Sequence, residues 1–334
     1  MRYSVSTISE LEHHVGRKPA AADMKVIDHI DPVAARWLEA ACIGFIGFSH
    51  AENMTLTIVD AGALHVTRDC LCFSAAAMDD RRLAKVGRQV GTLWLLPGTN
   101  ETIRVNGVVA SVDAGAVSIR VVECFAHCGK ALIRSEFWSP SSRASDNAYT
   151  DPTIAVSRSR LMIIATSNAS GAVDVSPKGD PAGLLAQFDG NTLRVAERPG
   201  NRRTDGFRNI LEQPRVAFLL LEPGATRIIR GHGVARLTTH PTTLEGFAVE
   251  KKIPKLALEV SVDAIKIETS DAFGVVAPWQ LTPDPSVNGA AEVFAAHVKI
   301  NRARNVSDRV AKVLVSMPGM MNAALRSDYK KNLY

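Results

Sequence analysis

The sequence predicts a mainly β protein with flanking helices, of the α+β class, in which two barrel-like antiparallel sheets follow one another. Three observations favour this fold class. Apolar and alternating runs of strand length, bounded by Gly and Pro turns, fill residues 42–138 and 156–279. The second set of runs repeats the first. Helical periodicity flanks the two sets, and 334 residues are enough for two domains.

The repeat is clearest in residues 90–107 and 216–233, where a buried strand reaches a Pro-Gly turn and an antiparallel strand returns. Corresponding residues lie 126 positions apart: Pro97, Arg104 and Gly107 in the first copy, and Pro223, Arg230 and Gly233 in the second. Both copies end on a tryptophan, Trp138 and Trp279, and the second copy has an insertion at 238–253. Each copy is therefore predicted to form one barrel. Two fused copies should pack as an internal pseudo-dimer about a pseudo-twofold axis.

The N-terminal elements follow from spacing and capping. Helices are predicted over 7–16 and 24–41, and Thr7 and Glu10 have the spacing of a capping box. The run 42–49 is predicted to be the first strand of the first barrel.

Composition shifts divide the chain into three parts. Residues 1–145 are predicted to hold the first barrel with its helical lead-in, and residues 150–282 the second barrel. A Ser-, Asp- and Pro-rich linker joins them. Residues 283–334 are predicted to be an extension with two amphipathic helices and a basic tail. These helices are also a candidate surface for pairing two chains as a homodimer.

The second copy carries a cluster of cations next to a predicted strand end. Ser176-Pro-Lys-Gly-Asp-Pro181 follows an apolar run, and Glu197-Arg-Pro-Gly-Asn-Arg-Arg203 is a turn ahead of a short helical segment. A lysine, guanidiniums and free backbone N–H groups at a helix start can bind a phosphate. The alternative is an ordinary solvated basic turn.

These motifs, with Asn209-Ile-Leu-Glu-Gln-Pro-Arg-Val216, resemble the pyridoxamine 5′-phosphate oxidase-like proteins, a flavin-binding split β-barrel family. The resemblance implies that the two barrels are FMN-binding split β-barrels and that the flavin lies at an interface, because single-copy members are homodimers with interfacial sites. It also implies an FMN-dependent oxidoreductase that acts on a small organic substrate, with NAD(P)H as a transient reductant.

The two copies have diverged in complementary ways. Where the second copy has its basic turn, the first has Ser74-Ala-Ala-Ala-Met-Asp-Asp80, followed by Arg81 and Arg82, in a shorter segment. The first copy alone has the segment Phe125-Ala-His-Cys-Gly-Lys-Ala-Leu-Ile-Arg-Ser-Glu-Phe-Trp138, which resembles the family's ending that reaches across the dimer interface. The sequence therefore predicts one competent flavin site per chain, between the barrels. The alternative is that both halves have decayed.

Roles for individual residues follow from their chemistry and from the resemblance. His127 and Lys130 are the candidate catalytic residues. The candidate cofactor-binding residues are Ser176, Lys178, Arg198, Asn201, Arg202, Arg203, Arg134 and Trp138. Asp180 and Asp205 are expected to orient the cations rather than to contact the flavin.

Composition excludes several other classes of protein. The net charge is +5, but no basic strand with interleaved aromatic residues of the RNA-binding type occurs, so no nucleic-acid partner is expected. No apolar run approaches the ~20 residues that span a bilayer, and the N-terminus lacks a signal-peptide core. The five cysteines have no metal-ligand spacing. We expect a cytoplasmic protein with a small-molecule substrate, no metal and no membrane partner.

A second function class stays open at this point. Split barrels also bind the deazaflavin F420 and haem, and a fold alone does not set a function. A non-catalytic flavin, F420 or haem binding protein or sensor is therefore the alternative. Oxidation of pyridoxamine phosphate itself is not expected, because the Arg-Leu-His-Asp-Arg-like ending of that enzyme is absent.

Overall fold

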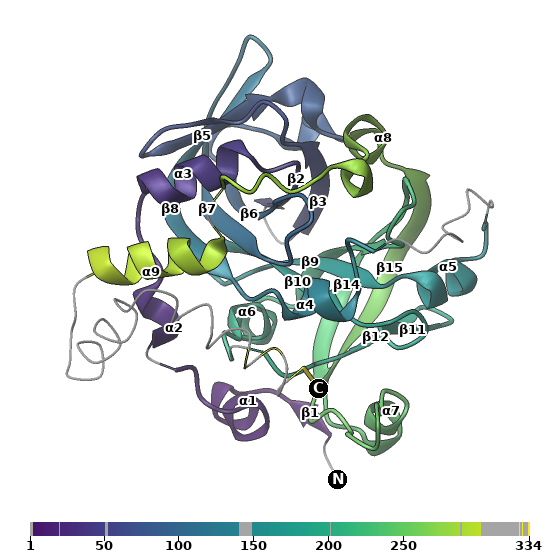
Figure 1. Ribbon diagram of the computed structural model, residues 1–334. Coiled ribbons are helices and arrows are strands. Elements are labelled where there is room, and N and C mark those ends of the chain that lie inside the picture. The colour runs from purple at the N-terminus through teal and green to yellow at the C-terminus, as the bar shows by residue number, and fades with distance from the viewer. Residues whose placement is uncertain are drawn as a thin grey trace.

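The computed structural model of the protein describes residues 3–19, 21–50, 53–139, 149–200, 202–287, 289–301, 327, 329, 333 and 334. Two antiparallel sheets dominate it, and helices lie around them (Figure 1). The predicted fold class, mainly β with flanking helices, is confirmed. Within the described part of the chain, none of the helices combines the length and apolar character needed to cross a membrane.

The first sheet, here called barrel one, has seven strands in the order β3-β2-β6-β7-β8-β5-β4. Its strands are β2 (Ile43–His50), β3 (Asn53–Asp60), β4 (His65–Val66), β5 (Cys70–Ser74), β6 (Gln89–Leu95), β7 (Thr102–Asp113) and β8 (Ala116–His127). Two 3-10 helices lie between β5 and β6, η1 (Ala75–Ala77) and η2 (Arg81–Leu83).

The second sheet, barrel two, has the order β10-β9-β13-β14-β15-β12-β11. Its strands are β9 (Leu161–Ser167), β10 (Val173–Gly179), β11 (Ala186–Asp189), β12 (Thr192–Ala196), β13 (Arg215–Leu221), β14 (Arg227–Thr238) and β15 (Ala257–Thr269). The short N-terminal strand β1 (Ser4–Val5) pairs with β14, so the start of the chain belongs to the second sheet.

The two sheets are duplicates, strand for strand. β6 and β13 have the same length and begin 126 residues apart, at Gln89 and Arg215. Both long hairpins shift register at the same place, between Asn106 and Gly107 and between His232 and Gly233. A Cβ on Gly107 would lie 2.0 Å from the carbonyl oxygen of Arg120, so this bulge needs glycine.

The helices complete the two barrels. They are α1 (Ile8–Val15), α2 (Ala21–Met24), α3 (Pro32–Glu39), α4 (Lys130–Arg134), α5 (Pro152–Arg158), α6 (Asp205–Glu212), α7 (Pro241–Glu245), α8 (Asp271–Val276), α9 (Ala290–Ile300) and the 3-10 helix η3 (Pro278–Gln280). α3 and α9 lie side by side against barrel one, and α5 lies beside β11 (Figure 1). The capping box predicted at Thr7 and Glu10 is present at the start of α1.

The barrels are joined by a core that both supply. Phe45, Leu56 and Leu93 of barrel one pack in one cluster with Ile163 and Leu219 of barrel two. Contacts are reciprocal: β6 meets β10, and its counterpart β13 meets β3. The predicted pseudo-dimer is therefore an extensive apolar interface within one chain.

One predicted helix is wrong. Instead of a continuous helix over 24–41, α2 ends at Met24 and α3 begins at Pro32. Asp31 caps α3 by accepting a hydrogen bond from Ala34 N. Asp31 also precedes Pro32, and a residue before a proline is disfavoured in the helical conformation. Between the helices, Ile27 pairs with Cys124, so tertiary pairing replaces the local helical preference.

The extension is only partly described. The helix predicted at 290–302 is observed as α9, whose Val293, His297 and Val298 are buried against barrel one and the segment before α3. This face is thus used inside the chain rather than offered to a second copy. The helix predicted at 306–316 and most of the basic tail lie outside the described residues.

Candidate functional site

The end of barrel one crosses onto barrel two. β8 runs to His127, and α4 then packs on β10. The contact is backbone to backbone, since a Cβ on Gly179 would lie 1.9 Å from the carbonyl oxygen of Ala131. The counterpart α8 of barrel two contacts β3. The crossing predicted for the His-Cys-Gly-Lys segment is therefore observed.

Arg134 fastens this crossing. Its Nε donates to the carbonyl oxygen of Gly179 at 2.9 Å, and its Nη1 donates to that of Pro199 at 3.3 Å. It also lies 3.8 Å from the carboxylate of Asp180. The buried guanidinium thus joins α4 to the end of β10 and to the basic turn. It also lines the cavity described below.

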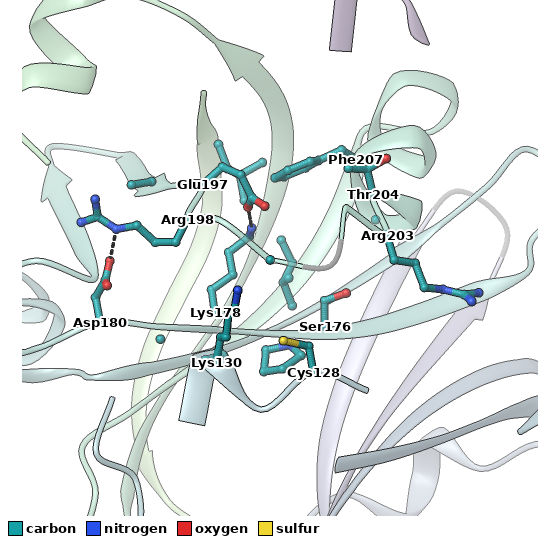
Figure 2. A pocket seen from close by; sticks show the side chains of 18 of the residues that line it. Cys128, Lys130, Ser176, Lys178, Asp180, Glu197, Arg198, Arg203, Thr204 and Phe207 are labelled. Carbon is teal, nitrogen blue, oxygen red and sulfur yellow. Dashed lines mark hydrogen bonds and ion pairs between the residues drawn. The ribbon is translucent and has the colours of Figure 1, made fainter. Parts of the chain in front are cut away.

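The central cations come from two different barrels. Lys178 on β10 and Lys130 at the start of α4 point into the same space, with Ser176 beside them (Figure 2). Lys178 Nζ donates to Glu197 at 2.6 Å and lies 4.4 Å from the ring centroid of Phe207 at the start of α6. These positions bring together residues that are 48 apart in the sequence.

The arginines of the basic turn are held by carboxylates. Arg198 Nε donates to Asp180 at 2.6 Å and its Nη1 donates to the carbonyl oxygen of Phe247 at 2.9 Å. Arg203 pairs with Asp205, and its guanidinium carbon lies 4.1 Å from the ring centroid of Phe125. Asp180 and Asp205 therefore orient these cations, as predicted. Arg198 and Arg203 extend in opposite directions, so they do not converge on one point (Figure 2).

Three other candidates lie elsewhere. Arg202 is exposed, with a positive φ of 55°, and it lines a neighbouring cavity instead. Trp138 does not line the cavity; it packs edge-on against Phe137 and its Nε1 donates to the carbonyl oxygen of Thr99. Asn201 lies outside the described residues.

The side chains of Lys130, Lys178, Arg198 and their neighbours surround a cavity of about 100 Å³ between the barrels, here called the interface cavity. Five of its described lining residues are cations, Lys130, Arg134, Lys178, Arg198 and Arg203, and two are carboxylates, Asp180 and Glu197. Such an excess of positive charge in a half-enclosed site favours an anionic ligand. Two buried nitrogens of its lining side chains, Arg198 Nη2 and His127 Nδ1, have no hydrogen-bond partner among the described residues.

The interface cavity fits a phosphate better than a whole flavin. Small-molecule pockets usually measure about 300–1,000 Å³. A side cavity of about 420 Å³ shares Lys130, Glu197 and Arg198 with it. A larger one of about 1,050 Å³ shares Arg203 with it. The unpartnered donors and the cations therefore fit the phosphate of a nucleotide, whose remaining part would need the neighbouring space.

Arg104 is a functional candidate that lies outside the basic motifs and the His-Cys-Gly-Lys segment. Its side chain is buried on β7, and it donates to Asp174 at 3.1 Å and to Ser176 at 2.9 Å across the barrel interface. It also lies 3.3 Å from His127 Nε2. The signal was present in the repeat, because Arg104 and Arg230 occupy equivalent positions.

The C-terminal residues also reach the site. Tyr329 Oη accepts a hydrogen bond from Gly129 N at 3.2 Å, and the carbonyl oxygen of Leu333 accepts one from Arg134 at 2.8 Å. The ring centroid of Tyr334 lies 5.5 Å from the guanidinium carbon of Arg198. A basic tail in the sequence gave no indication of these aromatic contacts.

The reciprocal position is built differently. The connection between β5 and β6, equivalent to the basic turn, carries Asp79 and Asp80. Asp79 accepts a hydrogen bond from Ala272 N at 2.9 Å, at the start of α8, and burial raises the pKa of its carboxyl group. A carboxylate at this position would repel a phosphate.

Comparisons with known proteins found one family match, which lies in barrel two, and several similar solved structures. Residues 154–275 match the family described as Pyridoxamine 5'-phosphate oxidase. Similar solved structures include HupZ of Group A Streptococcus, the conserved hypothetical protein Rv2991 of Mycobacterium tuberculosis and HutZ, the heme storage protein of Vibrio cholerae. Their identities are 18%, 19% and 13%, with TM-scores of 0.31, 0.29 and 0.25. The similarity covers 37%, 43% and 37% of this chain, and 96%, 96% and 92% of theirs. No curated protein was matched.

Proposed function

We propose that this chain, whose residues 154–275 belong to the pyridoxamine 5′-phosphate oxidase family, binds FMN between its two barrels and uses it to oxidise or reduce a small organic molecule. The observation that carries the proposal is the interface cavity. Cations from both barrels outnumber carboxylates there, and buried donors have no partner among the described residues.

Lys178, Lys130, Arg198 and Ser176 are the residues that would hold the phosphate. FMN phosphate is a dianion, and charge-assisted hydrogen bonds to it are worth about 1.5–3 kcal/mol each. Glu197 and Asp180 keep the cations of barrel two paired and in place, which limits the cost of burying them. In this proposal Arg203 and Arg202 lie near the ligand but do not bind its phosphate.

FMN would supply hydride and electron transfer, while the protein supplies binding, orientation and electrostatics. His127 and Lys130 line the cavity from barrel one, and in this proposal they contact the ligand while the basic turn contacts it from barrel two. The apolar side chains of Ile164, Leu185 and Ile210 line the same cavity and limit the access of water. A nicotinamide reductant would bind transiently.

The test is cofactor identification followed by a charge-removing variant. We expect the purified protein to show a flavin absorption spectrum and to release FMN on denaturation. Lys178→Met should weaken FMN binding by about tenfold or more, because it removes one charge-assisted contact. Isothermal titration calorimetry on the cofactor-free protein measures this loss.

The matched control is Arg82→Met, which removes an exposed cation from the equivalent connection of barrel one. It should leave FMN affinity unchanged. A haem Soret band or a bound F420 in the purified protein would show that the alternative ligand, and not FMN, is the one bound. Equal FMN affinity in wild type and Lys178→Met would refute the phosphate site.

A further inference from the structure

Arg104 on β7 connects three groups that lie on two other strands, β10 and β8. It is 2% exposed, and its hydrogen-bond partners are Asp174 and Ser176 on β10 and His127 at the end of β8. Two of these partners, Ser176 and His127, line the interface cavity, whereas Arg104 itself does not. Arg104 therefore acts on the cavity through its neighbours.

The contact between Arg104 and His127 fixes the tautomer of the imidazole. A guanidinium has only donors and keeps its protons in proteins, so His127 Nε2 must be the acceptor in the 3.3 Å contact. A neutral ring with Nε2 as acceptor carries its proton on Nδ1. That Nδ1 atom is buried and has no partner among the described residues.

The imidazole is also kept neutral. Burial lowers the pKa of His127 well below its ordinary value of 6.5, and the positive charges of Arg104, Lys25 and Arg203 lower it further. A second proton, which would turn Nε2 into a donor facing a guanidinium, is strongly disfavoured. His127 is consequently suited to donate a hydrogen bond and unsuited to accept a proton as a general base near neutral pH.

The duplicated position in barrel two shows what has changed. Arg230 is the counterpart of Arg104, and Glu268 is the counterpart of His127 by strand register. Arg230 pairs with Glu268 at 2.5 Å and also reaches across the interface, to the carbonyl oxygen of Leu56. The arginine that crosses the interface is thus common to both barrels. Only in barrel one does it meet a ring with a second nitrogen to offer.

We propose that Arg104 is a positioning residue that holds His127 as a neutral imidazole whose Nδ1–H is donated to an acceptor atom of the ligand in the interface cavity. The ligand side of this proposal rests on the proposed function. The protein side, the tautomer and its dependence on Arg104, is a property of the ligand-free chain.

The first experiment reads the tautomer directly. Histidine ¹⁵N labelling and long-range ¹H–¹⁵N correlation on the cofactor-free protein give the protonation of both ring nitrogens, and His127→Asn identifies the signals. We expect Nδ1 protonated and Nε2 bare from pH 8 down to pH 6. An Nε2–H tautomer or an imidazolium ion at pH 7 would overturn the proposal.

The dependence on Arg104 is tested with a charge-balanced pair. Arg104→Met with Asp174→Asn removes the guanidinium without leaving its carboxylate partner charged, and His127 should then lose its single tautomer and titrate closer to pH 6.5. Arg230→Met with Glu268→Gln is the matched control in barrel two, and it should leave the His127 signals unchanged. Retention of the wild-type tautomer in the first pair would show that Arg104 does not set it.

The second experiment tests the ligand contact. His127→Asn places an amide nitrogen near the position of Nδ1, whereas His127→Gln places one near Nε2. FMN affinity should fall no more than about threefold in the first variant and about tenfold in the second, the size of one lost hydrogen bond. Equal affinities in the two variants would overturn the ligand contact. Failure of the wild type to bind FMN would refute the proposed function instead, and the tautomer measurement would still decide the role of Arg104.

Discussion

At the scale of single residues, the cavity is lined by cations that are already paired. Lys178 has Glu197 and Arg198 has Asp180, at 2.6 Å in both cases. Removing one partner of a buried pair leaves an uncompensated charge, which is costly. The carboxylates therefore make a ligand-free state possible, and a ligand's phosphate competes with them for the same donors.

Lys25 is a buried cation that the proposed function does not use. Its Nζ lies 5.7 Å from the ring centroid of Phe125 and 6.0 Å from that of Phe294. Burial, followed by the positive charges of Arg203 and Arg104, lowers its pKa to about 7. The unfolded chain binds this proton up to about pH 10.5, so between these values the unfolded state holds more protons than the folded state.

The free energy of unfolding should therefore rise with pH between pH 7 and pH 10. We expect Lys25→Met to remove this rise and to stabilise the protein at pH 6.5 by on the order of 3 kcal/mol. Urea unfolding of both proteins at pH 6.5 and 9.5 measures it, with the exposed Lys85→Met as control. Parallel pH profiles for wild type and Lys25→Met would contradict the shift.

The residues of the site could be predicted from the sequence where a motif surrounds them. Lys178, Arg198 and their carboxylate partners lie in two linked motifs, so their meeting was expected. Arg104 is marked only by the repeat, and Tyr334 lies outside any motif. Both contact site residues through strand pairing or a chain end that is distant in sequence. No local spacing carries that information.

At the scale of elements, the site depends on how closely α4 approaches β10. Gly179 has no side chain where the backbone of Ala131 passes. We expect Gly179→Ala to push α4 away, to destabilise the protein by about 1–3 kcal/mol and to weaken FMN binding. Urea unfolding and calorimetry check the two effects.

Gly274 in α8 provides the matched control, because a Cβ there meets nothing within 4 Å. Gly274→Ala should be neutral or slightly stabilising, since alanine favours helix. Were Gly179→Ala to match it in both stability and FMN affinity, the close approach of α4 would have no bearing on the site.

Element prediction succeeded where the pattern was strong and failed where tertiary pairing overrode it. The hairpin strands of both repeats, β6 with β7 and β13 with β14, were identified by alternation and turns. The 24–41 helix was overpredicted because the apolar residues Ile27 and Ile30 fit a helical face but are used to pair with Cys124 and Arg68.

At the scale of the whole molecule, the duplication lets the two barrels differ. Barrel two supplies the basic turn and Lys178, and barrel one supplies the crossing segment with Lys130 and His127. The N-terminal helix α1 is attached to α6 of barrel two by the 2.6 Å ion pair of Glu12 with Arg208. The sequence predicted this difference between the two barrels, because the two copies have diverged in complementary ways. It did not predict the attachment of the chain ends, which depends on three-dimensional proximity alone.

From the same asymmetry we expect a single site per chain, because Asp79 at the reciprocal position is hydrogen-bonded to the start of α8. The most direct measurement is the FMN stoichiometry of the reconstituted, cofactor-free protein, by calorimetry and by absorbance after gel filtration. One FMN per chain is the predicted result. Two per chain, or none, would contradict it.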